Sequence, residues 1–438
     1  MTECNQTSFP FEAHFSRRVE ARFEGLRMTT DGGALLLRAT DKRIGLLRRV
    51  AACFQDARDP ERVEHELSQM LAQRIYGLAL GYEDLNDHEE LRRDPLFGML
   101  AGKRRLQEPL AGKSTLNRLE LTPAGAPQSQ RYHKISYSAE ALDRLLVEIF
   151  LEAHAEPPGQ IVLDLDATDT PLHGEQEARF FHGYYGEYCY LPLYIFAGEH
   201  LLCARLRPSN QDASAGSVEE LERIVRQIRR CWPLVRVIVR GDSGFCREEL
   251  MAWCETQRVE YVFGFARNER LRRKITRQLR EARREQQRTG KAARVFAEFS
   301  YRTRSSWSRR RRVVVTSLGA AVWPAQRLYE QLYCARGEME NRLKEQLSLF
   351  SDRLSTETLR ANQLRLYFSS LAYVLVAALR RLALAGTEWA TAQVETIRLR
   401  LLKIAAEVRV TARRIWVRYS HAYPWKHLFV AAHAALSG

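Results

Sequence analysis

Two apolar runs rich in β-branched residues, each ending in an acid, constrain the fold of this chain most strongly. The runs are IVLDLDAT at 161–168 and VRVIVRGD at 235–242, and the helical pattern SVEELERIVRQIRRC lies between them at 217–231. Runs of this kind are typical of buried strands. A helix between two strands favours a right-handed crossover that makes the strands parallel. The sequence therefore predicts a mixed α/β core in which both acidic ends lie side by side.

Three acids are the candidate functional groups of this core: Asp166 and Asp242 at the ends of the two runs, and Glu340 in the helical stretch YCARGEMENRLKEQ. Asp164 and Asp166 lie on the same side of their strand, so the pleat alone does not choose between them. Asp166 is closer to the C-terminal end, where open α/β sheets bind ligands. The structural alternative is that both acids bond to the following turn. Carboxylates are hard ligands that suit Mg²⁺ or Mn²⁺, and pairs of such ions promote in-line displacement at phosphorus.

A polar stripe surrounds Glu340 on its predicted helix. Tyr333, Arg336, Glu340 and Lys344 are three, four and four residues apart, so they share one helix face. Taken alone, this stripe is better explained as a solvated Arg336–Glu340–Lys344 ladder on the protein surface than as a functional site.

The charge balance indicates a polyanionic partner. The 438 residues include 68 Lys and Arg against 53 Asp and Glu, a formal net charge of +15 that is spread along the chain, and nucleic acid is the first candidate.

The longest uncharged run, between Arg365 and Arg380, is shorter than the roughly twenty residues of a membrane span, so no membrane is expected. The N-terminus shows no secretory pattern and the eight cysteines show no zinc-ligand spacing, so a cytoplasmic location is expected.

Changes in pattern divide the chain into regions. Residues 1–155 are predicted to form an all-helical unit, and the pattern changes at Pro157-Pro158-Gly159. Residues 156–268 and 323–385 are predicted to form the α/β core. An arginine-dense helix and a basic β-hairpin, with Trp307 near its tip, form a predicted β-rich insertion at 269–322. Residues 386–438 are predicted to be a mainly helical C-terminal region.

These features, in this order, resemble the cut-and-paste DDE transposases of bacterial insertion sequences. Asp166-Ala167-Thr168 resembles their first Asp-x-Thr, Asp242 in RGDSGF resembles their second Asp, and Tyr333-x2-Arg336-x3-Glu340 resembles their Tyr-x2-Arg-x3-Glu-x6-Lys signature. The likeness runs from about residue 20 to the end. The signature lysine is replaced by Leu347. Lys344 and Arg342 are the candidate substitutes, and Lys344 is preferred because it shares the face of Glu340.

The resemblance implies a fold, a cofactor and partners. It implies an RNase H-like core, an N-terminal unit that binds DNA ends, and two Mg²⁺ ions, replaceable by Mn²⁺, held by Asp166, Asp242 and Glu340. The implied partner is double-stranded DNA, both terminal inverted repeats and target DNA, with a homodimer in the DNA complex and a location at the bacterial nucleoid. Tyr333, Arg336 and Lys344 are the implied DNA contacts. Trp307, in preference to Trp323, is the candidate for stacking on a flipped base, and the alternative is that Trp307 only packs the hairpin.

Two other functions fit parts of the sequence. DLDAT matches the Asp-x-Asp-x-Thr motif of haloacid dehalogenase-like phosphatases, in which the first Asp is a covalent nucleophile. The further acid that such enzymes need is absent, because Cys246 and Arg247 stand at the relevant places. The second alternative is a catalytically inactive DNA-binding protein derived from a transposase. The presence of all three acids argues against it, and whether they converge in the folded chain is the test that separates the two functions.

Overall fold

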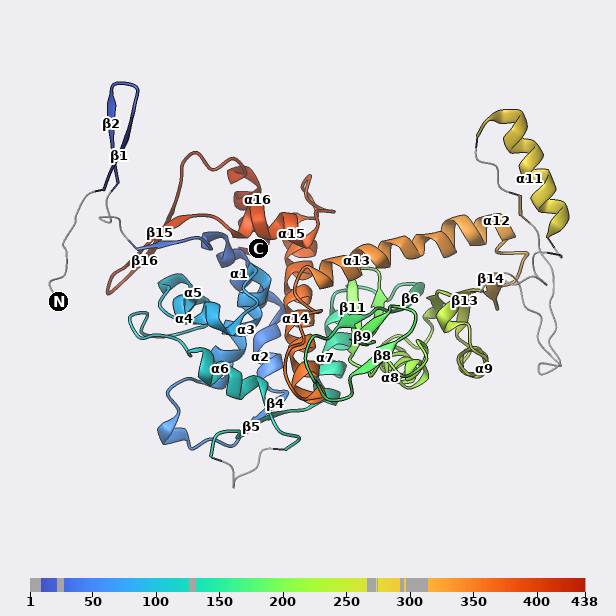
Figure 1. Ribbon diagram of the computed structural model, residues 1–438, viewed down its shortest axis with the longest axis horizontal. Coiled ribbons are helices and arrows are strands. Elements are labelled where there is room, and N and C mark those ends of the chain that lie inside the picture. The colour runs from blue at the N-terminus through green and yellow to red at the C-terminus, as the bar shows by residue number, and fades with distance from the viewer. Residues whose placement is uncertain are drawn as a thin grey trace.

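The computed structural model describes residues 9–21, 27–125, 131–265, 273, 275–291, 295–296 and 314–437. These residues form two bodies: a helical body, to which both ends of the chain contribute, and an α/β body around a six-stranded sheet (Figure 1).

The sheet has the order β11-β10-β6-β12-β13-β14. Its strands are β6 (Gln160–Ala167), β10 (Leu193–Ala197), β11 (His200–Arg205), β12 (Arg236–Gly241), β13 (Glu260–Gly264) and β14 (Val314–Thr316). Strand β12 is parallel to both β6 and β13, whereas β10 is antiparallel to β6 and β11, and β14 is antiparallel to β13. The predicted mixed sheet is confirmed, including the parallel pairing of the two runs that end in acids.

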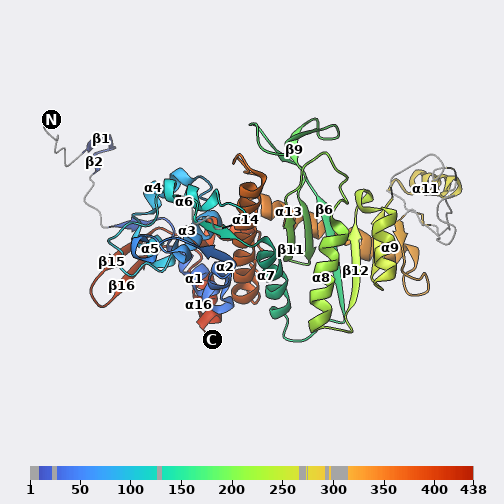
Figure 2. The ribbon, with the colours of Figure 1, turned by 90° about the horizontal axis from the view of Figure 1, so that it is seen from below.

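Helices cover both faces of this sheet. On one face lie α7 (Ala139–Glu152), α8 (Ser217–Cys231) and α9 (Glu248–Thr256), seen side by side in Figure 2. Leu163 and Leu165 of β6 point into that core. Because strand side chains alternate, Asp164 and Asp166 face the opposite side, where residues 325–347 form one continuous helical stretch that includes α12 (Ala325–Arg327) and α13 (Gly337–Leu347).

The helical body is arranged around α14 (Leu359–Leu379), which packs against α3 and α1. Its N-terminal helices are α1 (Leu35–Ile44), α2 (Leu46–Ala51), α3 (Leu67–Leu80), α4 (His88–Leu91), α5 (Pro95–Leu100) and α6 (Lys113–Glu120). Helix α14, with the turn that follows it, is long and apolar enough to cross a membrane, but 83% of its most apolar window is buried inside the protein, as in a core helix.

The C-terminal region belongs to the same body. It contains α15 (Val394–Ile397), the hairpin of β15 (Ala406–Val410) and β16 (Ile415–Tyr419), and α16 (Lys426–Ser437). Strand β15 pairs with β3 (Met28–Thr29), and α16 packs on α1. Lys403 forms an ion pair of 2.8 Å with the buried Asp31. The two ends of the chain therefore form one unit.

The prediction of an all-helical N-terminal unit is wrong in one respect. Strands β1 (Phe9–His14) and β2 (Arg17–Ala21) form a hairpin, and β4 (Phe54–Asp56) pairs with β5 (Ile135–Tyr137). The β4–β5 pair joins segments far apart in the sequence, and such long-range pairing leaves no local pattern.

Within the predicted insertion, the structure describes a helix and a strand. The arginine-dense helix is confirmed as α11 (Thr276–Thr289), whose residues are all at least partly exposed. Strand β14 joins the edge of the main sheet rather than a separate one. The hairpin predicted around Trp307 lies outside the described residues.

Helix α7 joins the two bodies. Its Leu142, Leu145 and Ile149 pack in the core of the helical body, whereas Val147 and Phe150 pack in the core beneath the sheet. One helix therefore contributes to both hydrophobic cores.

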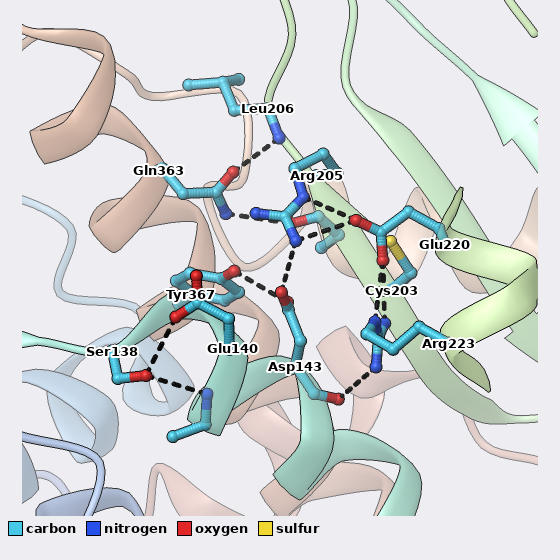
Figure 3. A network of polar contacts seen from close by, with 12 residues as sticks. Ser138, Glu140, Asp143, Cys203, Arg205, Leu206, Glu220, Arg223, Gln363 and Tyr367 are labelled. Atoms are coloured by element: carbon cyan, nitrogen blue, oxygen red, sulfur yellow. Dashed lines mark hydrogen bonds and ion pairs between the residues drawn. The ribbon is translucent and has the colours of Figure 1, made fainter. Parts of the chain in front are cut away.

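A buried polar network strengthens this junction (Figure 3). Asp143 of α7 accepts hydrogen bonds from Arg205 of β11 and from Tyr367 of α14, the latter at 2.7 Å. Arg205 also bonds to Glu220 of α8 at 2.8 Å, and Arg223 pairs with the same carboxylate at 2.9 Å. Elements of both bodies are thus held by charged groups that have partners inside the protein.

Candidate functional site

Asp164 and Asp166 have different partners although they share one face of β6. Arg240, which lies opposite Asp164 on β12, donates to its two carboxylate oxygens at 2.5 and 2.7 Å. Arg240 also donates to the backbone carbonyl of Leu332, and both members of the pair are buried. The oxygens of Asp164 are therefore held in a structural ion pair that fixes the 325–347 helix against the sheet.

Asp166 lies two residues nearer the strand end and remains partly open. Its side chain is 15% exposed, and Arg336 approaches one of its oxygens at 2.9 Å. Burial raises the pKa of Asp166 to about 6, the Arg336 charge opposes this shift, and the charges of Asp242 and Glu340 add to it. The three predicted acids therefore interact electrostatically at one place.

Asp242 directly follows β12. Because β12 and β6 are parallel and Gly241 pairs with Leu165, Asp242 emerges beside Asp166. Its carboxylate accepts the backbone N–H of Gly244 at 2.8 Å and so caps the short 3₁₀ turn Ser243–Phe245. This cap holds the carboxylate at the edge of the sheet.

Glu340 approaches the same edge from α13. Arg336 donates to it at 3.0 Å, so a single guanidinium joins Glu340 to Asp166. The Glu340 side chain is 52% exposed. The helix itself is anchored one turn later by Glu345, which is buried and forms an ion pair of 2.8 Å with Arg380 after α14. The third acid thus stands on a helix whose position is fixed from behind.

Tyr333 completes the predicted stripe and is half-buried. A Cβ atom added to Gly264 at the end of β13 would lie 2.5 Å from the Tyr333 hydroxyl, so only glycine leaves room for that ring. Burial raises the pKa of Tyr333, Arg336 opposes the shift and the nearby Asp242 adds to it. The structure therefore brings Tyr333, Arg336 and Glu340 together on the helix face that meets the sheet edge.

Two other predicted contacts are not placed at the acids. Lys344 is exposed on α13, one turn beyond Glu340, and no ion pair with a described residue holds it. Trp307 lies outside the described residues. Trp323 is half-buried, with Arg327 over its ring at 4.9 Å, an arrangement that packs it at the start of the long helical stretch.

Tyr185 is a neighbour of the site that the sequence analysis missed. It lies in the turn between β8 (Phe180–His182) and β9 (Glu187–Tyr190). Burial raises its pKa to about 12, with further contributions from Asp169 and Asp166. The run HGYYGEY contains glycines that signal a turn, but nothing in it indicates which part of the fold the turn approaches.

The donor set fits a hard divalent cation, although the acids are not arranged as a closed cage. Among the described residues, no three His, Cys, Asp or Glu side chains lie together as a ready ligand group. Arg336 lies between Asp166 and Glu340 and supplies the positive charge at that point. Two carboxylates that share one arginine, with a third carboxylate beside them, are oxygen ligands in excess of their counter-charge. This is the chemistry that Mg²⁺ and Mn²⁺ bind.

Comparisons with known proteins agree with the sequence resemblance. The family model described as transposase DDE domain group 1 matches residues 11–438. No curated protein matches the chain. Among solved structures, the cryo-EM structure of the piggyBac transposase synaptic complex with hairpin DNA is similar, with 11% identity, coverage of 86% of this chain and 81% of that chain, and a TM-score of 0.38. A score this low supports no conclusion about this chain.

Proposed function

This chain belongs to the transposase DDE domain family, group 1, and from that premise we propose that it cleaves DNA at the ends of an insertion sequence and joins those ends to target DNA. The reaction is metal-dependent hydrolysis and strand transfer at phosphodiester bonds. The DNA partners are the terminal inverted repeats and the target duplex. The protein works as a homodimer on DNA in the bacterial cytoplasm, at the nucleoid.

One observation carries this proposal: three acids from distant parts of the sequence act on one another at the sheet edge. Arg336 bonds to both Asp166 and Glu340, and the charges of Asp242 and Glu340 raise the pKa of Asp166. Gathering like charges in a partly buried site is unfavourable unless a ligand uses them. A DNA-binding protein without catalysis has no use for such a cluster.

Asp166, Asp242 and Glu340 are the residues that would hold Mg²⁺ or Mn²⁺. A pair of such ions would activate the attacking oxygen and stabilise the leaving oxygen of an in-line displacement. In this chain Arg336 stands between two of the acids, and its release from Asp166 would free the guanidinium for a DNA phosphate. Tyr333 packs against Gly264 and holds the helix face at the edge, and Lys344 contributes a further phosphate contact.

The sheet supports an RNase H-like core. Strands β11, β10 and β6 are antiparallel neighbours, and β12 and β13 follow in parallel. Asp242 and Glu340 are separated by the segment that contains α11, which is where an insertion between the second and third acids is expected. Trp307, in that segment, remains the proposed platform for a flipped base.

The geometry disfavours the phosphatase alternative. In DLDAT the nucleophile of that motif would be Asp164, yet Arg240 bonds to both of its oxygens and the pair is buried. A carboxylate held in this way has no free oxygen to attack a phosphoryl group.

Cleavage and binding assays on the same preparations test the proposal. Purified protein is incubated with Mg²⁺ and duplexes that carry the two ends of the element surrounding its gene. Asp166→Ala, Asp242→Ala and Glu340→Ala should each abolish cleavage and leave end binding intact, because each removes a ligand but little phosphate-contacting surface. Glu338→Ala, an exposed acid on the same helix, is the matched control and should cleave normally.

Two outcomes count against the proposal. If wild-type protein bound the ends but left them uncut with Mg²⁺ and with Mn²⁺, the catalytic assignment would be wrong. If one triad variant cleaved at the wild-type rate, that residue would be removed from the triad.

A further inference from the structure

A basic groove lies in the helical body, on the side of the β15–β16 hairpin. Its volume is about 560 Å³. One wall is the segment 102–107 after α5, the other is the tip of the hairpin, and Arg38 of α1 also lines it. The hairpin and α5 are neighbours in the fold (Figure 1). Segments from the two ends of the chain therefore build this groove.

The lining of the groove is strongly positive. It includes six cationic side chains and no carboxylate, and the six are Arg38, Lys103, Arg104, Arg105, Arg413 and Arg414. Glu108, just outside, pairs with Arg105 at 3.2 Å and with Lys103 at 3.7 Å. No ion pair within the described ranges engages Arg104 or Arg413, and both are exposed. Like charges crowded around a concave surface repel one another and raise the local concentration of anions.

The other side chains in the groove are mostly aliphatic. Met99, Leu106, Val410 and Ile415 line it beside the cations. Val410 and Ile415 are opposite each other in the hairpin, so both project from the same face. Aliphatic surface flanked by arginines suits a sugar–phosphate backbone, in which apolar deoxyribose alternates with phosphate. The same arginines and Gln107 carry donors that can also reach base edges.

A second basic groove, between α8 and α9, differs in its charges. It is lined by Arg226, Arg229 and Arg230 and has a volume of about 350 Å³. Glu222 lies in its lining and pairs with Arg226, and Arg229 donates to backbone carbonyls of residues 257 and 258. Most of its positive charge is therefore already engaged, and it provides a matched control surface.

We propose that the groove between the 102–107 segment and the β15–β16 hairpin binds the phosphate backbone of duplex DNA. The inference rests on the proposed function, since it supplies a holding surface for the DNA that the sheet edge cuts. Neither Arg104 nor Arg413 belongs to the candidate active site.

Salt-dependent binding to DNA of mixed sequence tests the proposal. A short fluorescein-labelled duplex is titrated with full-length protein at several salt concentrations. The double variant Arg104→Gln, Arg413→Gln removes one charge from each wall and should reduce the slope of log K against log salt by about 2, since each phosphate contact contributes about 0.9. Arg226→Gln, Arg230→Gln removes the same charge from α8 and should leave the slope unchanged. Both residues of each pair are exposed, so both variants should fold normally.

The outcomes separate this proposal from the proposed function. An unchanged slope in the groove variant, or an equal loss in both variants, would overturn the groove as a DNA site while leaving the catalytic proposal untouched. An unchanged slope together with altered self-association in sedimentation would assign the groove to contacts between copies and would also overturn it. If the groove variant loses binding but cleaves element ends at saturating protein, both proposals stand.

Discussion

The acids at the α7 junction and the acids at the sheet edge differ in how their charges are balanced. At the junction, Asp143 and Glu220 face two arginines, Arg205 and Arg223. Although burial acts in the opposite direction, these arginines lower the pKa of Glu220, whereas burial raises the pKa of Asp143 against the same two charges. Each carboxylate there has a counter-charge, so the group serves to hold elements together.

At the sheet edge, carboxylates outnumber the arginines that pair with them. Asp166 and Glu340 share Arg336, and Asp242 adds a third negative charge nearby. Burial raises the pKa of Asp166 to about 6; the charge of Arg336 opposes this shift, and the charges of Asp242 and Glu340 add to it. The contrast shows that a buried acid does not by itself mark a functional site. An excess of acids over their counter-charges does.

Removing an acid from the balanced group should have the largest effect. Asp143→Ala leaves Arg205 without one of its partners and frees the hydroxyl of Tyr367, so we expect a loss of about 3–5 kcal/mol in the free energy of unfolding. Urea denaturation measures it. Glu140→Ala, on the same helix but exposed, is the control and should cost much less. A loss below that of the control would show that the network contributes nothing to stability.

Removing an acid from the unbalanced group should instead raise the free energy of unfolding at neutral pH. Asp166 binds its proton more tightly in the folded state, with a pKa of about 6 against 3.8, so folding stability falls as pH rises from about 4 to about 6. Asp166→Asn should remove about 2–3 kcal/mol of this pH-dependent loss. Urea denaturation at pH 4 and pH 7 measures the difference between wild type and variant. If the free energy of unfolding changed with pH in the same way for both proteins, the idea that the sheet edge carries an excess of negative charge would be wrong.

A divalent cation should restore the balance at the sheet edge. Mg²⁺ or Mn²⁺ at ten times its dissociation constant should stabilise the wild-type protein by about 1.4 kcal/mol. Thermal unfolding with and without the ion detects the effect without any catalytic assay. Glu340→Gln and Asp242→Asn should show a much smaller shift. An equal shift in wild type and both variants would mean that the ion binds elsewhere.

The smallest effect is expected at Lys344, which is exposed on α13 and lies outside both groups. Lys344→Ala should reduce the salt slope of end binding by about one unit if the side chain contacts a single phosphate. Lys344→Arg keeps the charge and should retain the slope. An unchanged slope in the alanine variant would show that Lys344 is a solvated surface residue that contacts no phosphate.

The sequence predicts the sheet and its acids because both depend on local patterns. The β-branched runs and their period of two place Leu163 and Leu165 on one face and Asp164 and Asp166 on the other. The pattern could not show which of the two acids is the candidate ligand. The difference between them comes from Arg240, which lies opposite Asp164 in the sheet and pairs with it. In the sequence, Arg240 is only one more polar residue in a strand.

Tertiary contacts explain what the sequence could not show. The C-terminal hairpin joins the N-terminal helices because Ala406 pairs with Thr29, and no local pattern records such a distant pairing. Tyr185 reaches the neighbourhood of Asp166 through the path of a loop, which depends on packing rather than on residue type. The meeting of the three acids at one sheet edge could thus be predicted from sequence, whereas the pairing of each acid with its arginine required the fold.

The sharing of α7 between two cores has a consequence for spacing along DNA. Val147 and Phe150 belong to the core under the sheet, while Leu145 and Ile149 belong to the core of the helical body that carries the basic groove. Within the described residues, side chains of one helix are therefore packed into both bodies. If a duplex were held in the groove and cut at the sheet edge, the distance between these two sites on the protein would determine where the cut falls relative to the contact. The fold, and not the base sequence alone, would then set how many base pairs separate the contact from the break.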